Sequence, residues 1–275
     1  MMHAASRETY KASVDALASY AKRVKSDTVR ATADDLISVA GLLGSEPRLR
    51  RALSDPARDG KDRAGLADSV LKGKVSAGAL KLVTVLAGGR WSRATELLNG
   101  TEALGVEAYL VAAGKDGNLA EVEDELFRFG QVVAGDSGLS NALSDSSVPA
   151  AQRSTLAAAL LEGKAQPVTL RLVDVALAGF GGRGFGPGIA RLVELAAEKR
   201  EQQLAFVTVA STLTEDQEQR LTAKLARMYG REVSVKVTVD PDIVGGMSVR
   251  VGDDLYDGTV SRRLTDARHA LAGDH

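Results

Sequence analysis

One glycine-rich segment has the spacing of a nucleotide-binding loop. Residues 179–184 read GFGGRG and match GxGxxG, a pattern that brings a pyrophosphate to the start of a helix. Such a fingerprint opens directly into a helix, whereas Pro187 and Gly188 intervene here, and the related segment 90 residues earlier ends in GGRWSR without the pattern. We therefore predict a flexible helix–helix connection. A phosphate loop of the form GxxxxGK(S/T) does not occur in the sequence.

Other residue types that carry out chemistry are scarce or poorly placed. The chain has no cysteine, which excludes disulfides, thiolate metal sites and cysteine nucleophiles. Its histidines, His3, His269 and His275, lie at or near the ends and are interpreted as solvated. The acidic run Glu121 to Glu125 is interpreted as a solvated helix face rather than a cation site. We predict no catalytic residue, no cofactor and no metal.

The composition describes an ordinary globular chain of 275 residues that is long enough for two domains. Aromatic residues make up only 4% of it, so the cores must consist mainly of Ala, Leu and Val, and Trp91 is interpreted as a packing anchor. The net charge of −1 argues against a nucleic-acid-binding protein. We expect neither a signal peptide nor a membrane-spanning run, so any membrane association requires a partner and not direct insertion.

An internal repeat organises the first two thirds of the chain. The segment that begins LSDPARDG at Leu53 matches the segment that begins LSDSSVPA at Leu143, an offset of 143 − 53 = 90 residues. The match runs without a gap from Asp34/Asp124 to Gly89/Gly179. We interpret it as a duplication, since a repeated unit of this kind is a structural signature.

Both copies have the periodicity of helices. Leu119, Val122, Leu126 and Phe129 recur at spacings of three and four residues, which places them on one helix face. Short helices that are separated by turns predict a helical bundle. We predict a first copy over residues 1–104 and a second copy over residues 105–203.

The last seventy residues change to a mixed pattern. Residues 205–211, AFVTVAS, form a β-prone run, and Thr214 with Gln217 has the spacing of a capping box at the start of a helix. Valines then alternate with polar residues over 233–239, the clearest strand pattern in the chain. A hairpin and a last helix follow. Residues 204–275 are therefore predicted to form a small α/β domain behind the helical copies.

This last segment carries a family resemblance. Residues 239–264, VDPDIVGGMSVRVGDDLYDGTVSRRL, together with STLTEDQ at 211–217, resemble the delta subunit family of F-type ATP synthases, which includes the mitochondrial oligomycin-sensitivity-conferring protein. Residues from about 104 to 203 resemble the family's helical bundle more weakly, and the extra copy in front resembles the long chains of high-GC Gram-positive bacteria. The structural signature residues are Asp240, Pro241, Gly245, Gly246, Asp257 and Gly258.

The resemblance implies a non-catalytic peripheral-stalk subunit at the cytoplasmic face of the plasma membrane. Such a subunit binds the N-terminal segment of an α subunit through its helical bundle and the b subunit through its C-terminal domain. We expect the second copy to keep the α-binding groove and the first to add another docking surface. The candidate partner-contact residues are Tyr109, Leu170, Val173 and Leu177.

Two other functions remain open at this stage. The chain could be a helical-repeat adaptor with an appended α/β domain that has no connection with ATP synthase. It could also be a Rossmann-type enzyme that uses residues 179–184.

Overall fold

The computed structural model describes residues 3–201, 204–229, 233–240, 243–251, 254–262 and 264. The chain divides into two compact units, residues 1–196 and 197–275. Within the described residues the first unit is helical, and the second contains a four-stranded sheet. The predicted fold class, a duplicated helical region followed by a small α/β domain, is confirmed.

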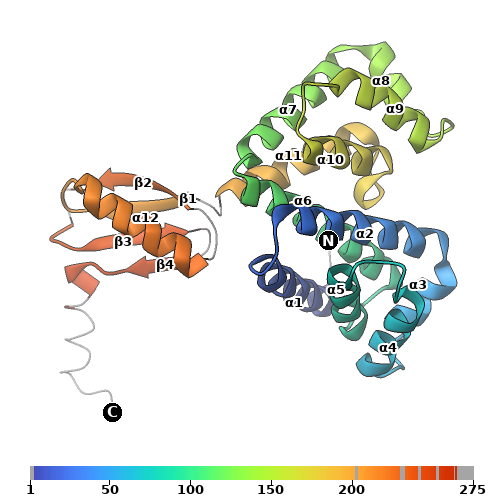
Figure 1. The fold of residues 1–275 in the computed structure, drawn as a ribbon, viewed down its shortest axis with the longest axis horizontal. Coiled ribbons are helices and arrows are strands. Elements are labelled where there is room, and N and C mark those ends of the chain that lie inside the picture. The colour runs from blue at the N-terminus through green and yellow to red at the C-terminus, as the bar shows by residue number, and fades with distance from the viewer. Residues whose placement is uncertain are drawn as a thin grey trace. The chain divides into compact units, whose positions relative to one another are not determined.

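The helical unit contains two copies that share one helix (Figure 1). The first copy consists of α1 (Ala4–Ala21), α2 (Ser26–Ser45), α3 (Pro47–Ser54), α4 (Gly60–Leu71), α5 (Ala77–Gly88) and α6 (Ala94–Asp116). The second begins with α6 and continues with α7 (Leu119–Gly135), α8 (Ser137–Ser144), α9 (Ala150–Leu161), α10 (Pro167–Leu177), the short 3-10 helix η1 (Phe180–Gly182) and α11 (Phe185–Glu201).

The element bounds repeat at the offset found in the sequence. Helices α3 and α8 start at 47 and 137, and α4 and α9 start at 60 and 150, a difference of 90 residues in both cases. The predicted boundary between residues 104 and 105 falls inside α6, because this long helix is the last of one copy and the first of the next. The other predicted boundary, between 203 and 204, lies beyond the last residue of α11.

One hydrophobic core runs through both copies. It includes Leu36 and Leu86 of the first copy, Leu104 of the shared helix, and Leu126 and Leu172 of the second, all of them 0% exposed. Trp91 is buried as predicted, and its ring nitrogen donates to the Leu86 carbonyl at 2.7 Å. Because α6 contributes side chains to both halves of this core, neither copy is complete without it.

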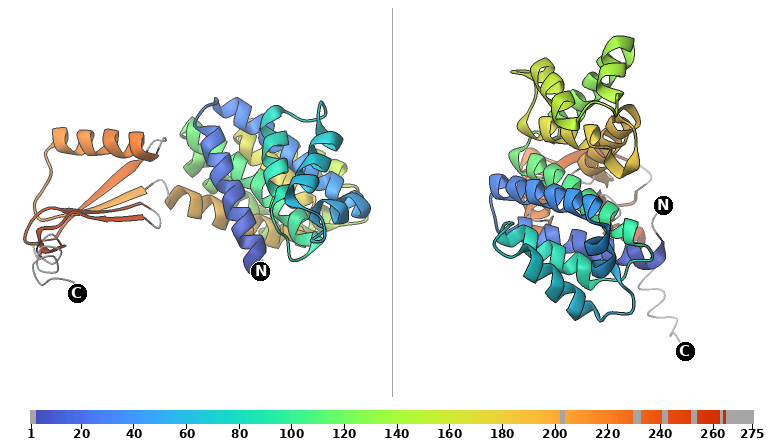
Figure 2. Two further views of the ribbon diagram at one scale, coloured as in Figure 1. Left: turned by 90° about the horizontal axis from the view of Figure 1, so that it is seen from below. Right: turned by 90° about the vertical axis from the view of Figure 1, so that its right-hand side faces the viewer.

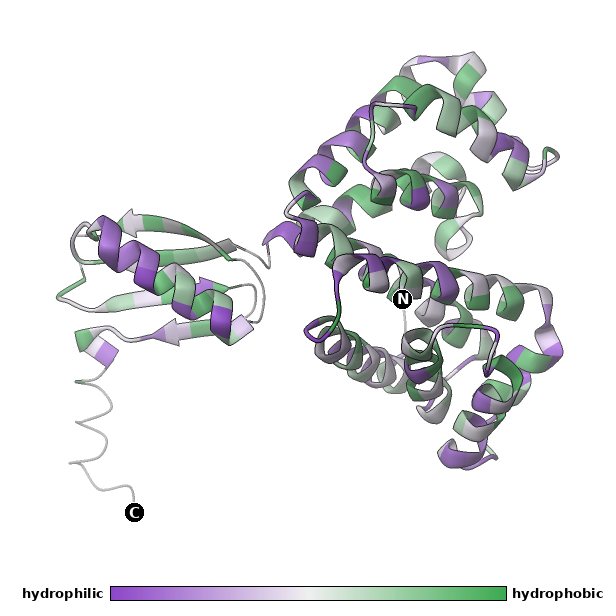
Figure 3. Cartoon of the chain, viewed as in Figure 1, coloured by the Kyte–Doolittle hydropathy of each residue, from purple (hydrophilic) through white to green (hydrophobic). Residues whose placement is uncertain are grey.

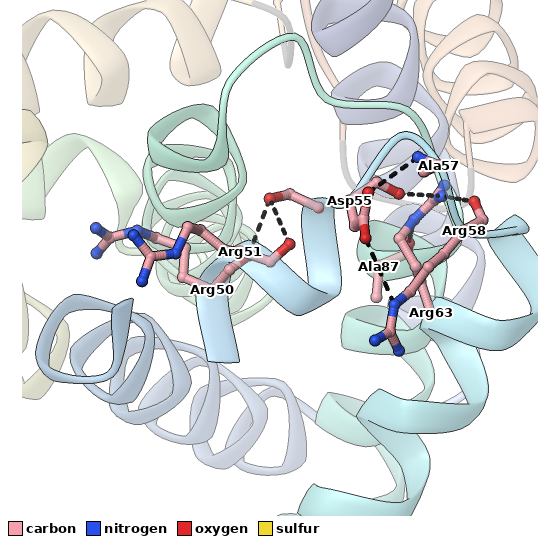
Figure 4. A network of polar contacts seen from close by, with 8 residues as sticks. Arg50, Arg51, Asp55, Ala57, Arg58, Arg63 and Ala87 are labelled. Atoms are coloured by element: carbon pink, nitrogen blue, oxygen red, sulfur yellow. Dashed lines mark hydrogen bonds and ion pairs between the residues drawn. The ribbon is translucent and has the colours of Figure 1, made fainter. Parts of the chain in front are cut away.

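An arginine in each copy fastens the loop that follows α3 in the first copy and α8 in the second. Figure 4 shows Arg63, which is 4% exposed. Its guanidinium donates to the carbonyls of Asp55, Arg58, Ala87, Gly88 and Gly89. The counterpart Arg153 is only partly buried and donates to the carbonyls of Val148 and Leu143. Each guanidinium thus supplies hydrogen-bond donors to backbone carbonyls of the turn, which would otherwise need water as a partner.

The second unit is a sheet with one helix across one face, as Figure 2 shows. The strand order is β2-β1-β3-β4, with β1 parallel to β2 and antiparallel to β3. The elements are β1 (Leu204–Val209), α12 (Glu215–Tyr229), β2 (Ser234–Val239), β3 (Met247–Val251) and β4 (Asp254–Asp257). The predicted order of strand, helix, strand and hairpin is therefore correct.

The core of this unit lies between α12 and the sheet. Ala205 and Val207 of β1 and Val249 of β3 are buried together with Leu225 of α12. Hydrophilic residues run along α12 (Figure 3). The predicted capping box is confirmed, since the Thr214 N–H donates to Gln217 Oε1 at 2.9 Å and the Gln217 N–H donates to Thr214 Oγ1 at 3.3 Å.

Some predictions lie outside the described residues. These are the signature residue Pro241, the histidines His269 and His275, and the last helix beyond Leu264.

Candidate functional site: an apolar groove in the second helical copy

The glycine-rich segment is a turn between two helices and not a nucleotide loop. Gly179, Gly181 and Gly182 all have positive φ, a conformation that favours glycine. The Gly181 N–H, which a phosphate would need, donates instead to Glu102 Oε2 at 2.8 Å. Burial raises the pKa of Glu102, while this N–H and the charge of Arg183 act in the opposite direction. The Glu102 carboxylate of the chain itself therefore takes the place that a phosphate would need.

The glycine-rich segment leads directly into a helix, contrary to the prediction that Pro187 and Gly188 separate the two. Helix α11 begins at Phe185, so Pro187 and Gly188 lie in its first turn and do not separate the glycines from the helix. The element before the glycines is helix α10, however, where a dinucleotide fingerprint requires a strand. The helix–helix connection is retained for that reason. Proline is tolerated in a first turn because its missing N–H would have no helical partner there.

Two predictions of solvated side chains also need correction. His3 is half-exposed, but its Nδ1 lies 2.6 Å from Glu96 Oε1. Within the acidic run, Glu125 is partly buried, and its Oε2 accepts the Gln166 N–H at 2.9 Å and the Thr169 hydroxyl at 2.5 Å. Glu125 thus caps the start of α10. The sequence did contain a signal for this role, because Glu125 aligns with Asp35 at the offset of 90 residues. Asp35 accepts the Ser76 N–H at 2.7 Å in the equivalent place of the first copy.

The predicted partner-contact residues lie largely inside the helical unit. Tyr109, Val173 and Leu177 are 2%, 1% and 3% exposed, and Leu170 is partly buried against the core. The Tyr109 hydroxyl donates to Asp34 Oδ1 at 2.6 Å. A partner at Tyr109 would compete with Asp34 of α2, whereas Val173 and Leu177 lie within the hydrophobic core.

An apolar groove of about 570 Å³ opens elsewhere in the second copy, between α7, α8 and α11. Its lining residues are Leu126, Phe127, Gly130, Gln131, Val133 and Ala134 of α7, Ser140 and Ser144 of α8, and Phe185, Gly186, Pro187, Ile189, Ala190 and Val193 of α11. Within this set the polar side chains are amide and hydroxyl groups, and none is charged. Such a lining can bind an apolar surface, but none of its side chains is a general acid or base.

The floor of the groove is where α7 and α11 meet. The rings of Phe129 and Phe185 pack edge to face with centroids 6.2 Å apart and an angle of 80°. Beside them, Ile189 comes so near α7 that a Cβ on Gly130 would lie 3.1 Å from its Cγ2. Phe127 on the wall is 51% exposed. An exposed phenylalanine over an apolar hollow is typical of a surface that a partner covers.

Two backbone hydrogen bonds hold the signature glycines of the C-terminal unit close to one another. The Gly258 N–H donates to the Met247 carbonyl at 3.0 Å, and the Val260 N–H donates to the Gly245 carbonyl at 2.9 Å. Gly246 has φ +86°, and a Cβ there would lie 2.5 Å from the Gly258 carbonyl oxygen. Glycine is therefore required at Gly246 by both conformation and space.

The remaining described signature residues turn the chain. Asp257 Oδ1 accepts the Thr259 hydroxyl at 2.7 Å and the Thr259 N–H at 3.0 Å. These two hydrogen bonds hold the pKa of the Asp257 carboxyl below its usual value. Asp240 ends β2, where its N–H donates to the Val209 carbonyl at 2.9 Å. In this structure the described signature residues shape backbone turns.

The described residues contain no group of three or more side chains that could hold a metal ion. No helix within that part of the chain is long and apolar enough to cross a membrane. A duplicated helical bundle with an apolar groove, followed by a small α/β unit, defines a class of binding and scaffolding proteins. Proteins of this class act through non-covalent binding.

Comparison with known proteins gives the family. Residues 106–271 match the family model described as ATP synthase delta (OSCP) subunit. The chain is 61% identical over 272 residues to the ATP synthase subunit delta of Salinispora arenicola, covering 99% of each chain. It is 42% identical over 272 residues to that of Streptomyces griseus, covering 99% of this chain and all of the relative. The chain belongs to the ATP synthase delta (OSCP) family, whose members are structural, non-catalytic subunits.

The family match begins within α6, at residue 106. It therefore covers the second copy and the C-terminal unit and leaves α1 to α5 outside. The full-length relatives from actinobacteria also cover the first copy. The duplication is thus shared with these relatives, and the groove lies in the part that the family model describes.

Proposed function

We propose that this chain is the peripheral-stalk subunit that holds the catalytic head of a proton-translocating ATP synthase against rotation. The full-length similarity to proteins named ATP synthase subunit delta carries this proposal. A rotor transmits torque to the head only if the head is held still. The chain would act at the cytoplasmic face of the plasma membrane, attached to the membrane sector through the b subunit.

The groove between α7, α8 and α11 is the proposed docking site for the N-terminal segment of an α subunit. An amphipathic helix binds by laying its apolar face into a hydrophobic groove. The uncharged lining and the half-exposed Phe127 suit such a face. We place the contact in this groove and not at Tyr109, Val173 and Leu177, because the chain itself buries those three side chains.

The C-terminal unit is the proposed site for the b subunit. It has its own core, formed by α12 and the sheet. Apolar side chains nevertheless remain exposed on it, with Val244 at 83% and Leu255 at 64%. Exposed apolar residues that gather on a small domain are typical of protein contact surfaces.

The first copy has a different proposed role. Its α2 covers α6, and Asp34 on that helix bonds to Tyr109 of α6 and pairs with Arg171 of α10 at 3.3 Å. These contacts would brace the second copy. The expectation that the first copy adds another docking surface stays a prediction.

Calorimetric titration of an α N-terminal peptide into the full chain tests the groove. Phe127→Ser should weaken binding by about tenfold or more, because the exposed ring is lost from the docking surface. Leu160→Ser is the matched control, since Leu160 is an exposed leucine of α9 outside the groove. Equal affinities for the two variants would rule out this groove as the docking site.

A fragment that ends near Gln203 tests the division of labour. We expect it to bind the catalytic head and to lose the b subunit in a pull-down from membranes. Retention of the b subunit by this fragment, at the level of the full chain, would contradict the assignment of b to the C-terminal unit.

A further inference from the structure

We propose that α8 and α9 form an adjustable wall of the groove, and that Ala150 prevents α9 from packing closely onto the end of α10. Helix α8 lines the groove with Ser140 and Ser144, and residues 145–149 join it directly to α9. A shift of α9 therefore moves the α8 side of the groove. The inference assigns a positioning residue to this site, and it rests on the proposed function only for what the groove binds.

Helices α9 and α10 can be compared with α4 and α5 position by position. Both pairs lie within the ungapped part of the repeat, in which residues 34–89 match residues 124–179. The buried positions of the two pairs also correspond at the offset of 90 residues: Ala67 and Leu71 with Ala157 and Leu161, and Leu82 and Val83 with Leu172 and Val173. Differences in packing between the two pairs can therefore be assigned to single residues.

A glycine brings α4 onto the end of α5 in the first copy. A Cβ on Gly60, the first residue of α4, would lie 2.4 Å from the Gly88 carbonyl oxygen. Only glycine allows this approach, because the obstacle is a backbone atom in a closely packed interior. Ala150 stands in the place of Gly60, and α9 and α10 pack less closely than α4 and α5. A Cβ on Gly88 would meet nothing closer than 3.7 Å, so Ala178 in its place does not block the approach.

Arg63 fastens the close approach in the first copy. Its guanidinium donates to the carbonyls of Ala87, Gly88 and Gly89 at 2.9, 3.2 and 2.8 Å (Figure 4). These carbonyls belong to the end of α5 and the residue after it. Arg63 therefore ties the start of α4 to the end of α5.

The equivalent arginine of the second copy makes a different connection. In the part of the chain that the structure describes, Arg153 donates to the carbonyls of Leu143 and Val148 at 2.8 and 3.1 Å and to none of α10. Leu143 belongs to α8 and Val148 to the loop before α9. Arg153 thus fastens α9 to α8 and leaves the end of α10 untied, so that α8 and α9 can shift together.

The looser packing of α9 exposes two leucines. Leu156 and Leu160 are 39% and 38% exposed, whereas their counterparts Leu66 and Val70 are partly buried against the core. The Ser154 hydroxyl still donates to Asp174 Oδ1 of α10, and the inner face of α9 stays buried. Helix α9 is therefore attached but has fewer restraints than α4, which lowers the free-energy cost of local opening.

Hydrogen exchange of the full chain, followed by mass spectrometry, provides the first test. Without peptide, the amides of α9 should exchange about tenfold or more faster than those of α4, because the hydrogen bonds to the end of the next helix are missing. Ala150→Gly should slow the exchange of α9. The matched control is Ala151→Gly, at the next and exposed position.

The control separates close packing from helix propensity. Glycine is a poor helix former, so Ala151→Gly should leave the exchange of α9 unchanged or make it faster. Slower exchange in Ala150→Gly alone supports the inference. Equal exchange of α4 and α9 in the parent chain, or no slowing in Ala150→Gly, overturns it.

Exchange measured with the α N-terminal peptide separates the wall from the docking site. Among the described residues, those that line the groove include none of α9. We nevertheless expect the peptide to slow exchange in α9 as well as in α7 and α11, because the wall settles on the bound helix. Protection of α7 and α11 without α9 overturns the inference and leaves the docking site in place. Protection of none of the three rules out the docking site, and the measurement without peptide then decides the inference.

The reverse substitution in the first copy tests the glycine independently. Gly65 is the matched control for Gly60, because it lies in the same helix and a Cβ there would have no atom within 4 Å. Alanine is the better helix former, so Gly65→Ala should raise the Tm. Gly60→Ala should lower it by about 2–4 °C or more and speed the exchange of α4, since the new Cβ meets the Gly88 carbonyl. An equal increase in Tm for both variants would contradict the role assigned to Gly60 and Ala150.

Discussion

The two helical copies share a frame and differ in what their last helix presents. Helices α3 and α8, and α4 and α9, have matching bounds 90 residues apart. The pair formed by α2 and α6 is closed, whereas α7 and α11 enclose a groove. The duplication therefore preserves helix lengths and turns, whereas the surroundings of the last helix differ between the copies.

The arginines that fasten the loops after α3 and α8 give the largest expected difference between the copies. Arg63→Ala should lower the free energy of unfolding by about 3 kcal/mol or more, because it leaves several buried carbonyls unpaired. Arg153→Ala should cost about 1–2 kcal/mol, since this guanidinium is partly exposed and donates to fewer carbonyls. Urea denaturation followed by circular dichroism measures both. Equal losses would mean that the two loops are fastened alike.

The carboxylate caps should behave alike in the two copies. Asp35 accepts the Ser76 N–H at 2.7 Å, and Glu125 accepts the Gln166 N–H at 2.9 Å. Each substitution to alanine should cost about 1–2 kcal/mol, as expected for a lost helix cap. Thermal unfolding of the two variants provides the measurement. A neutral Glu125→Ala beside a destabilising Asp35→Ala would show that the second copy does not depend on its cap.

The hydrogen bond that joins the copies should have a smaller effect with a defined pH dependence. Burial, together with the bond to Asp34 and its charge, raises the pKa of Tyr109 above its usual value. This stabilisation is complete below the ordinary tyrosine pKa of about 10 and is lost as the pH rises above it. Tyr109→Phe should cost about 1 kcal/mol near pH 8.

The pH profile separates this tyrosine from the others. Between pH 8 and 11, the free energy of unfolding should decrease less steeply with pH for Tyr109→Phe than for the parent chain. Tyr10 is the internal comparison, because burial raises its pKa as well and it remains in both proteins. Parallel profiles would mean that Tyr109 makes no contribution to the alkaline loss.

The ion pair beside this bond should contribute least. Arg171 Nε lies 3.3 Å from Asp34 Oδ1, with side chains 54% and 41% exposed. Exposed pairs contribute about 0–1 kcal/mol, so Arg171→Ala should change the Tm by less than Tyr109→Phe. A larger loss for Arg171→Ala would show that charge, rather than the buried tyrosine, holds the copies together.

The sequence by itself determined the repeat, the helical class of residues 1–201 and the change to strands after Leu204. Each of these depends on local signals: an ungapped offset of 90, three- and four-residue spacing, and alternating valines. The sequence also indicated glycine at Gly246, since consecutive glycines after a turn suggest a special backbone conformation. The family resemblance was likewise carried by contiguous residues.

Only the tertiary structure decided where the groove lies. Tyr109, Val173 and Leu177 have the apolar character of a binding face, but they lie in the core of the chain itself, and Tyr109 bonds to Asp34 of α2, a helix that ends more than sixty residues earlier. Phe127 and Ile189 have the same character, and they line the groove between α7, α8 and α11. Periodicity identifies a buried face without naming what buries it, since a core contact and a partner contact require the same apolar side chains.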